Sequence, residues 1–338
     1  MKVVSKIMQG QELLEHKDFS GGSVVIFGSM NADYTVTTER LPAGGETVVG
    51  GPLTILPGGK SSNQAAAVAR LGARAVMLGK LGTDANGDFL ESQLVSAGVD
   101  MSSVVRWDGP SGATVITVDK HGENTIVLSA GANEHVDPAY VDSVQSQLAQ
   151  GSVLGLCLES PMEAVTRAAE IAHQAGLTVV LNDSPFQGLL PAELIANVDL
   201  LLVNEHEMWQ LIRHEGDQMP VLSGEGWWKR LDWAEIASRL KGVGFESVIV
   251  TLGSAGSMVL EDGSAEHVDA VSVKAVDTTG CGDSFMGAVL AGLATGSSLL
   301  DSAKMAAYVS AYAATGRGAQ ASYGNLEQVR AYFAQGGR

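Results

Sequence analysis

The chain has 338 residues and a net charge of −17, with 45% apolar and only 5% aromatic residues. This length is sufficient for a large core, and the acidic balance argues against nucleic acid as a partner, because phosphate neutralisation needs clustered Lys and Arg. No apolar run reaches the ~18 residues needed to span a bilayer, and the first 22 residues are too charged for a signal peptide. Two cysteines in so long a chain are typical of a reducing compartment, so we expect a cytoplasmic protein without a membrane partner.

The order of predicted elements divides the chain into an N-terminal extension, residues 1–22, which we expect outside the fold, and a domain of residues 23–338. Apolar strands are predicted at 23–28, 75–81, 152–158, 177–182, 198–204 and 247–252. Helices are predicted at 87–97, 161–175, 233–240, 284–294 and 300–314. This alternation indicates an α/β fold with a doubly wound, mostly parallel sheet flanked by helices. Residues 213–231, which include the pair Trp227-Trp228, are irregular and are predicted to be a packed insertion.

Four further segments interrupt the alternation and predict a separate small β-sheet. Tyr34–Thr38 and Thr47–Leu56 read as strands on either side of a turn, and Thr114–Asp119 forms a hairpin with Asn124–Leu128. We expect this sheet, about 34–56 and 112–129, to cover a site as a lid. Because an uncharged edge strand has to be covered or paired, we also expect a homodimer in which two lids pack together.

The stretch from Val276 to Phe285, VDTTGCGDSF, carries the most informative chemistry. It joins a predicted strand, Val271–Val276, to a helix that begins near Ser284. The amides of Gly280, Cys281 and Gly282 lie at the start of this helix, where the positive end of the helix dipole favours an anion. Asp283 stands beside them as a carboxylate that can accept a proton from a hydroxyl. An anion site next to a base predicts phosphoryl transfer to an alcohol.

A second glycine-rich loop, Pro57 to Gln64, opens an alanine-rich helix. It is not a P-loop, because the pattern G-x-x-x-x-G-K-[ST] requires glycine where this chain has Thr54. We interpret the glycine pair as a place where the backbone approaches a neutral polar ligand, with Lys60 and Asn63 as hydrogen-bonding side chains.

Both motifs resemble signatures of the ribokinase-like (pfkB) family of sugar kinases, and the resemblance extends from Ser23 to about Tyr323. The sequence DTTGCGD is similar to the family's DTxGAGD, with Cys281 in place of alanine. The sequence GGKSSNQ is similar to GGKGANQ and departs from it at Ser61 and Ser62. The resemblance implies transfer of the γ-phosphate of ATP to the 5-hydroxyl of D-ribose, with Mg²⁺ required and K⁺ stimulating.

The resemblance also implies roles for individual residues. Asp283 is implied as the base for the sugar's primary hydroxyl, and the amides of Gly280, Cys281 and Gly282 as the anion hole. The residues implied to bind the sugar are Asn31, Asp33, Gly59, Lys60, Asn63 and Glu159. Those implied to line the ATP site are Asn204, Thr251, Gly253, Gly256 and Gly282, while Ala307 stands where related kinases often have a polar residue near the adenine. Glu207, the last residue of an NxxE motif, is implied to position hydrated Mg²⁺. A site for K⁺ is implied at Asp277, Thr279, Ala313, Gly316, Gly318 and Ser322.

Simpler structural roles remain open for several of these residues. Asp283 would serve equally as a helix N-cap, Glu159 as the cap of the helix that follows it, and Lys60 as a solvated surface residue. Asn204 and Glu207 would also fit a solvated helix start.

Alternatives also remain open for the whole protein. One is a kinase for another furanose, deoxyribose or a nucleoside, and another is a catalytically silent sugar-binding regulator on the same fold. Asp33 favours a ligand rich in hydroxyls, because a buried carboxylate without partners is costly. A dinucleotide oxidoreductase is disfavoured, since Phe285 stands where the third glycine of G-x-G-x-x-G would fall.

Overall fold

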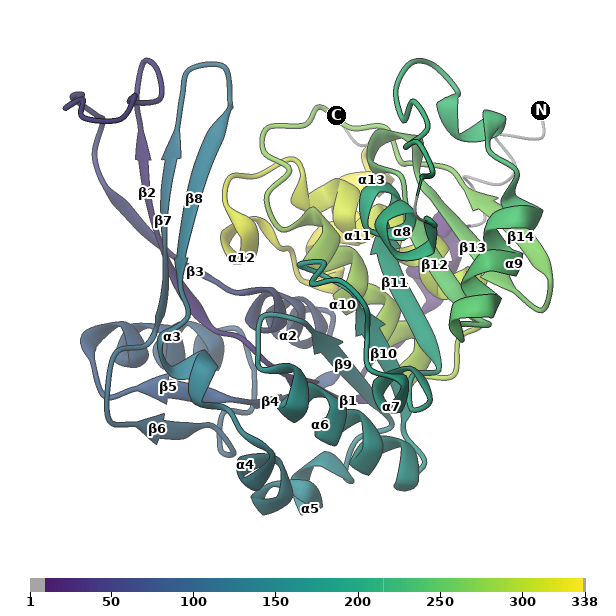
Figure 1. Ribbon diagram of the computed structural model, residues 1–338, viewed down its shortest axis with the longest axis horizontal. Coiled ribbons are helices and arrows are strands. Elements are labelled where there is room, and N and C mark those ends of the chain that lie inside the picture. Colours follow the sequence, from purple (N-terminus) through teal and green to yellow (C-terminus); the bar gives the residue numbers. More distant parts are fainter. Residues whose placement is uncertain (1–9, 215, 337–338) are drawn as a thin grey trace.

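A computed structural model describes residues 10–214 and 216–336, and its centre is an eight-stranded sheet (Figure 1). Six neighbouring strands are parallel: β12 (Val248–Thr251), β11 (Leu200–Asn204), β10 (Thr178–Asn182), β9 (Val153–Cys157), β1 (Ser23–Phe27) and β4 (Arg74–Leu78). Two antiparallel strands, β13 (Ser257–Glu261) and β14 (Ser264–Val268), complete the sheet beyond β12. The fold class predicted from the sequence is confirmed.

Helices cover both faces of this sheet, because strands buried on both sides alternate their side chains between two cores. Val24 and Ile26 enter one core, whereas Val25 and Phe27 enter the other. The helices of the first core are α2 (Lys60–Arg70), α3 (Ala85–Ser96), α10 (Cys281–Ala294), α11 (Leu299–Ala313) and α13 (Leu326–Ala334). The second core is closed by α4 (Pro138–Ser143), α5 (Gln145–Leu148), α6 (Met162–Gln174), α7 (Ala192–Ile195), α8 (Glu205–Ile212) and α9 (Trp233–Val243).

A separate four-stranded sheet projects from one end of the domain, at the left of Figure 1. We call it the small sheet; its strands, in order, are β3 (Thr54–Gly58), β2 (Asn31–Thr37), β7 (Gly112–Val118) and β8 (Asn124–Ser129). Beneath it lies a two-stranded sheet of β5 (Lys80–Gly82) and β6 (Val105–Trp107). The strand predicted at 47–56 is shorter than expected, because Gly50, Gly51 and Pro52 leave the preceding residues in a loop.

The region before α10 differs from the prediction. Val271–Val276 is not a strand, since the sheet already ends at β14 and the amide of Val276 bonds to the carbonyl of Ala314 at the end of α11. The β13–β14 hairpin and α13 were not predicted. The insertion packs as expected: Trp227 is buried in the second core and Trp228 stacks on His267 at 3.7 Å between ring centroids.

The expectation that the N-terminal segment lies outside the fold is wrong for residues 10–22. Residues 10–16 are helical, and the side chains of Leu14 and Phe19 are 1% exposed within the first core. The Arg330 guanidinium on α13 donates to the carbonyls of Leu14 and Lys17 at 2.9 and 2.5 Å. Burial of two large apolar side chains therefore attaches the segment to the domain; residues 1–9 lie outside the described residues. Within the described part of the chain, no helix is long and apolar enough to cross a membrane.

Candidate active site

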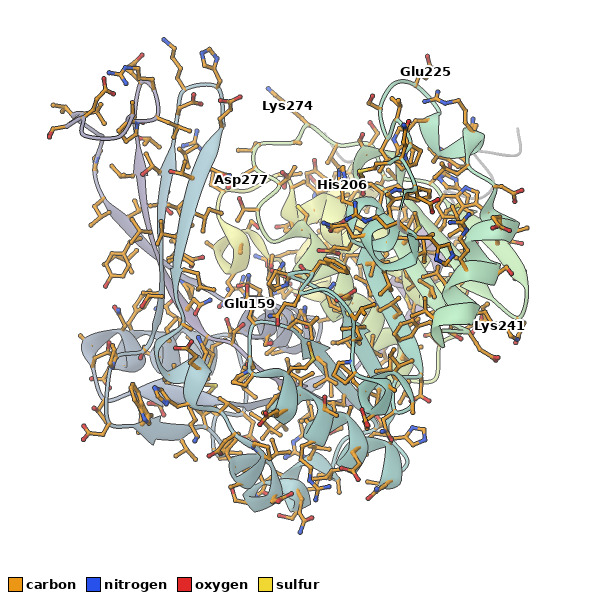
Figure 2. The ribbon with its side chains drawn as sticks, viewed as in Figure 1. Glu159, His206, Glu225, Lys241, Lys274 and Asp277 are labelled. Carbon is orange, nitrogen blue, oxygen red and sulfur yellow. The ribbon has the colours of Figure 1, made fainter. Side chains whose placement is uncertain are left out.

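The predicted site residues gather at the carboxyl ends of the parallel strands, where α/β sheets bind ligands. Glu159 follows β9, Asn204 ends β11, and the starts of α2 and α10 bring Lys60 and Asp283 to the same edge. Figure 2 shows Glu159 and Asp277 between the small sheet and the central sheet. The two glycine-rich motifs, about 220 residues apart in the chain, therefore meet at one edge of the sheet.

Asp283 lies in the first turn of α10 with its side chain 8% exposed. Its Oδ2 accepts a hydrogen bond from Asn63 Nδ2 at 2.8 Å. Burial raises the pKa of this carboxyl to about 6, against the opposing effects of the Lys60 charge and the Asn63 hydrogen bond. The carboxylate is thus mostly ionised at neutral pH yet more basic than an exposed one, as a general base requires. It is not the helix cap, because that position belongs to Gly280.

The start of α10 is shaped by two glycines. Gly280 has φ 74°, and a Cβ there would lie 2.5 Å from both the Ala319 Cβ and the Tyr323 hydroxyl, so this left-handed turn requires glycine. A Cβ on Gly282 would meet nothing within 4 Å, so its surroundings are open. Burial raises the pKa of the half-buried Cys281 thiol to about 11, and the charges of Asp277 and Asp283 add to the effect, so the thiol stays protonated at neutral pH. The Cys281 amide donates to the Thr278 carbonyl at 3.2 Å, so open space at the helix start is shown only around Gly282.

Lys60 and Glu159 flank Asp283. Glu159 Oε2 accepts from Ser29 Oγ at 2.5 Å and from the Lys60 amide at 3.0 Å, so Glu159 bonds the first residue of α2 and does not cap α6. Burial opposes the charge on the Lys60 ammonium, but the carboxylates of Asp283 and Glu159 outweigh it and raise its pKa. Lys60 is consequently a half-buried cation within an acidic cluster. The alternative that it is a solvated surface residue is therefore wrong.

Asp33, in β2 of the small sheet, is close enough to Glu159 and Asp283 for their charges to act on it. One of its oxygens accepts from the Thr114 hydroxyl, and the carboxylate lies so close to Gly58 that any Cβ there would overlap it. Burial raises the pKa of Asp33 to about 6, and the Glu159 and Asp283 charges add to the effect. Gly59, with φ 94°, brings its backbone against Ser29 and Asn31. The small sheet thus supplies a half-buried carboxylate, and the Thr114 hydroxyl occupies one of its oxygens.

Two residues that the sequence analysis missed hold the predicted ones in place. Gln320 Nε2, in α12 (Ala319–Ser322), donates to Asn63 Oδ1 at 3.0 Å, which turns the Asn63 amide nitrogen toward Asp283. Asn133 Nδ2 donates to Asn31 Oδ1 at 2.8 Å, while its own oxygen accepts from the Met30 amide at 3.0 Å. Neither residue lies in a recognisable motif, and only the folded chain places it beside the site.

Asn204 and Glu207 form a capping box at the start of α8. Asn204 Oδ1 accepts from the amides of His206 and Glu207 at 2.9 and 2.8 Å, and Glu207 Oε2 accepts from the Asn204 amide at 2.8 Å. The alternative considered for Asn204 and Glu207, a structural role at a helix start, is therefore confirmed. The capping box uses neither Asn204 Nδ2 nor Glu207 Oε1, so it does not prevent these two atoms from contacting a ligand.

Three further residues predicted to line an ATP site lie at the end of β12 or just after it. The hydroxyl of Thr251 donates to the Val203 carbonyl at 3.4 Å. Gly253 and Gly256 have φ 56° and 95° and form the tight turn between β12 and β13. A Cβ on Gly253 would meet nothing within 4 Å, so this turn leaves room for a ligand.

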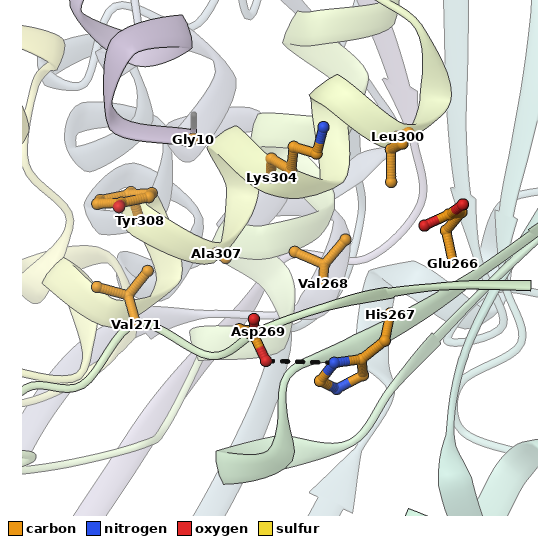
Figure 3. A pocket seen from close by; sticks show the side chains of 10 residues that line it. All are labelled: Gly10, Glu266, His267, Val268, Asp269, Val271, Leu300, Lys304, Ala307 and Tyr308. Carbon is orange, nitrogen blue, oxygen red and sulfur yellow. Dashed lines mark ion pairs between the residues drawn. The ribbon is translucent and has the colours of Figure 1, made fainter. Parts of the chain in front are cut away.

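A small cavity lies between β14 and α11, and Figure 3 shows its lining. Ala307 and Tyr308 from α11 face Val268 and Val271, and the His267–Asp269 ion pair, at 3.3 Å, lies at one side. None of the carboxylates described above lines it. We therefore do not assign the reaction chemistry to this cavity, although Ala307 was predicted near an adenine.

The residues predicted to hold K⁺ lie in two neighbouring segments, the loop before α10 and the turn after α11. Asp277 accepts from the amides of Thr279 and Gly318, each at 2.9 Å, and these bonds lower its pKa although burial opposes the change. The Gly316 amide bonds to the Ala313 carbonyl at 3.2 Å, and a Cβ on Gly316 would lie 2.7 Å from the Ser322 Cβ. The loop before α10 is thus joined to the turn after α11.

Asp183, which the sequence analysis missed, follows β10 at the same sheet edge. Its side chain is 0% exposed, and among the described residues neither carboxylate oxygen has a hydrogen-bond partner. Burial and the negative charge of Glu207 raise its pKa to about 7.

Residues 22–325 match the family described as pfkB family carbohydrate kinase. The chain is 38% identical over 320 residues to a ribokinase of Schizosaccharomyces pombe, which covers 92% of this chain and 98% of the relative. It is 31% identical over 312 residues to a deoxyribokinase of Salmonella typhi, at 92% and 98% coverage. The structure of Arabidopsis thaliana ribokinase complexed with ribose and ATP superimposes with a TM-score of 0.82 and 29% identity, covering 91% of this chain and 97% of that one.

Proposed function

Since this chain belongs to the pfkB family of carbohydrate kinases, we propose that it transfers the γ-phosphate of ATP to the 5-hydroxyl of D-ribose, giving D-ribose 5-phosphate. The observation that carries this proposal is the buried Asp283 carboxylate at the start of α10, with Asn63 on one side and Lys60 and Glu159 beside it. The S. pombe relative and the ribose complex of the A. thaliana protein support ribose as the sugar.

In the proposed reaction, Asp283 accepts the proton of the sugar's 5-hydroxyl as that oxygen bonds to the γ-phosphorus and the bond from phosphorus to the β–γ bridging oxygen breaks. The amides of Gly280, Cys281 and Gly282 donate to the phosphoryl oxygens, on which negative charge is spread in the transition state. Asn31, Asp33, Gly59, Lys60, Asn63 and Glu159 hold the sugar, and Asn204, Thr251, Gly253 and Gly256 line the nucleotide site. The small sheet, which carries Asp33, covers the sugar and excludes water.

Magnesium is expected to bind beside Glu207. The residues fit this ion, because the capping box uses only Oε2 of Glu207 and several carboxylates act on the charge of Lys60. When bound, Mg²⁺ would neutralise phosphate charge. The ion would thereby offset the repulsion between the ATP phosphates and these carboxylates.

Activity in sodium or Tris buffer is expected to rise several-fold on addition of K⁺, because carbonyl groups of the Asp277–Thr279 loop and the Ala313–Ser322 turn would cage the ion and fix the loop before α10. The Asp277→Asn variant should lose most of this activation, since its carboxylate ties the two segments together. Initial rates in matched ionic strength measure the effect. Equal rates and equal nucleotide affinity with and without K⁺ would contradict the prediction.

The protein is expected to be a dimer in solution. The register of the small sheet places Ile55, Tyr34, Val115 and Val127 in one row across its face. Ile55, Val115 and Val127 are 42%, 56% and 67% exposed, and an apolar row of this kind is normally covered. Light scattering at micromolar concentration should give twice the chain mass, and Val115→Glu should reduce it to the monomer. A monomeric wild type would refute the dimer.

The experiment that tests the proposed function is a phosphorylation panel of free pentoses, hexoses and nucleosides with Mg-ATP. Ribose should give the highest kcat/KM, with the 5-phosphate as product by NMR. The Asp283→Ala protein, purified in the same way, controls for contaminating kinases. The wild type should phosphorylate at least one sugar faster than Asp283→Ala does. If it does not, a sugar-binding protein without kinase activity becomes the better interpretation.

A further inference from the structure

The insertion predicted at residues 213–231 is a part of the chain that the proposed reaction does not use. Trp227 fixes it to the second core with a side chain that is 8% exposed, and Trp228 lies partly buried against the same core. The Trp228 carbonyl accepts from Trp233 Nε1 at 2.9 Å. Large rigid side chains with these contacts hold the end of the insertion in one position, so it is suited to support a neighbouring segment.

That neighbour is His267 on β14. Its ring is stacked on Trp228, with 3.7 Å between the centroids and 10° between the planes. His267 Nε2 lies 2.7 Å from the Ala255 carbonyl oxygen, and a carbonyl only accepts, so Nε2 carries a proton and donates it. The other ring nitrogen, Nδ1, lies 3.3 Å from the Asp269 carboxylate, the ion pair drawn in Figure 3. Two edges of the ring therefore contact oxygen atoms while Trp228 covers its face.

Ala255 belongs to the turn between β12 and β13, and its carbonyl is part of the peptide group that continues to Gly256. Gly256 has φ 95° and ψ −132°, a conformation that is readily accessible only to glycine. In tight turns, the peptide group next to a glycine has alternative orientations, which distinguish the turn types. The bond from His267 selects the orientation in which the Gly256 amide bonds to the Gly253 carbonyl at 3.1 Å.

The two ends of this turn have different surroundings. A Cβ on Gly256 would lie 2.1 Å from the Val268 carbonyl oxygen, so this end is pressed against β14. A Cβ on Gly253 would meet no atom of the described residues within 4 Å, and Gly253 is exposed. A ligand of this turn therefore approaches at Gly253, while His267 and Trp228 support the turn from the side of β14.

We propose that Trp228 and His267 are positioning residues for the nucleotide: Trp228 holds the His267 ring, and His267 holds the peptide group of Ala255 in the orientation that the nucleotide meets. This inference rests on the proposed function in taking the turn from Gly253 to Gly256 as part of the ATP site. A turn that is fixed before binding loses less conformational entropy on binding, so the pair raises nucleotide affinity. The proposal gives neither residue a part in sugar binding or proton transfer.

The test is calorimetric titration of the full chain with Mg-ADP and, separately, with ribose. Trp228→Ala should raise the ADP Kd roughly two- to tenfold, the range for loss of one hydrogen bond, and leave the ribose Kd unchanged. Trp228→Phe keeps an aromatic face for the stack and should restore most of the affinity. Trp107→Ala is the matched control, because Trp107 also stacks on a histidine, His135, at 3.8 Å, but lies on β6. It should leave the ADP Kd unchanged.

Substitutions of His267 test the second step. His267→Leu removes the donor to the Ala255 carbonyl and should weaken ADP as much as Trp228→Ala does. His267→Gln keeps a donor and should weaken it less. If Trp228→Ala does not fold, His267→Leu is measured in its place, with the same outcomes deciding.

Three results would overturn the proposal: an unchanged ADP Kd in folded Trp228→Ala, equal losses of ADP and ribose affinity, or a Trp228→Phe protein as weak as Trp228→Ala. The second of these results would indicate a general disturbance of the fold. The proposed function fails separately. A wild type that binds no ADP would refute the nucleotide site itself, and this proposal with it, whereas unchanged ADP binding in Trp228→Ala leaves the proposed function standing.

Discussion

The Asp283→Ala variant is expected to phosphorylate ribose roughly 10²–10⁴ times more slowly than the wild type, the usual range for loss of a general base. The carboxylate is buried at the start of α10 and oriented by Asn63, which is itself oriented by Gln320. The substitution removes the proton acceptor but leaves the backbone amides of the helix start in place. The Kd values of ATP and ribose, measured by calorimetry, should therefore change little while kcat falls.

Asp88→Ala is the matched control, because Asp88 also occupies the first turn of a helix, α3, but its side chain is 81% exposed. This variant should keep wild-type turnover. Near-normal turnover in Asp283→Ala would remove Asp283 from the mechanism. A loss of kcat accompanied by an equally large loss of ATP binding would show that the substitution disturbs the helix start instead.

The pH profile of kcat/KM gives an independent check on the same group. The pKa of Asp283 is raised to about 6 by burial, so the base is ionised above that pH and protonated below it. Activity should accordingly fall as the pH decreases through about 6, whereas an ordinary Asp would remain active to about pH 4. Asp33 has a similarly raised pKa, so protonation of both carboxylates should contribute to the loss of activity at low pH. In the Asp33→Asn variant, which keeps Asp283, kcat/KM should still fall at low pH, but less steeply than in the wild type.

Ribose is expected to be phosphorylated about ten- to a hundred-fold more efficiently than 2-deoxyribose. Asp33 is half-buried, and Thr114 is the donor that the structure assigns to one of its oxygens. If it accepts bonds from two adjacent sugar hydroxyls, loss of one hydroxyl leaves a charged acceptor unmatched, at about 1.5–3 kcal/mol. The Asp33→Asn substitution should lower kcat/KM for ribose and reduce the ratio of kcat/KM between ribose and 2-deoxyribose. Values of kcat/KM for both sugars, in both proteins, measure this effect.

Asp119→Asn, in the turn between β7 and β8 of the same sheet, is the control and should leave the ratio unchanged. A nucleoside should be a poorer substrate than either pentose, because a sheet closed over a free sugar leaves no room for a base. Because one relative of this chain is a deoxyribokinase, the comparison of ribose with 2-deoxyribose tests the choice of substrate directly. If deoxyribose or a nucleoside is phosphorylated more efficiently than ribose, the kinase assignment stands but ribose is not the substrate.

The sequence by itself determined the architecture and indicated the family. Buried parallel strands give apolar runs that local sequence reveals. Glycines at fixed spacing before a helix are also a local pattern, so the motif of Gly280, Gly282 and Asp283 was recognisable and predicted an anion site. The loop from Gly58 to Asn63 was recognisable for the same reason, since a close backbone approach requires glycine. These features depend on neighbours in the chain.

Only the tertiary structure decided what supports these residues. Gln320 orients Asn63 from 257 residues away, and no local pattern encodes such a contact. The burial of Leu14 and Phe19 against the core likewise depends on helices near the C-terminus, so a charged N-terminal segment was wrongly expected outside the fold. Asp183 looked like any polar residue after a strand, and only the fold shows that it is fully buried. Side chains acquire such roles from contacts that form only when distant segments pack, and these contacts leave no period or spacing in the sequence.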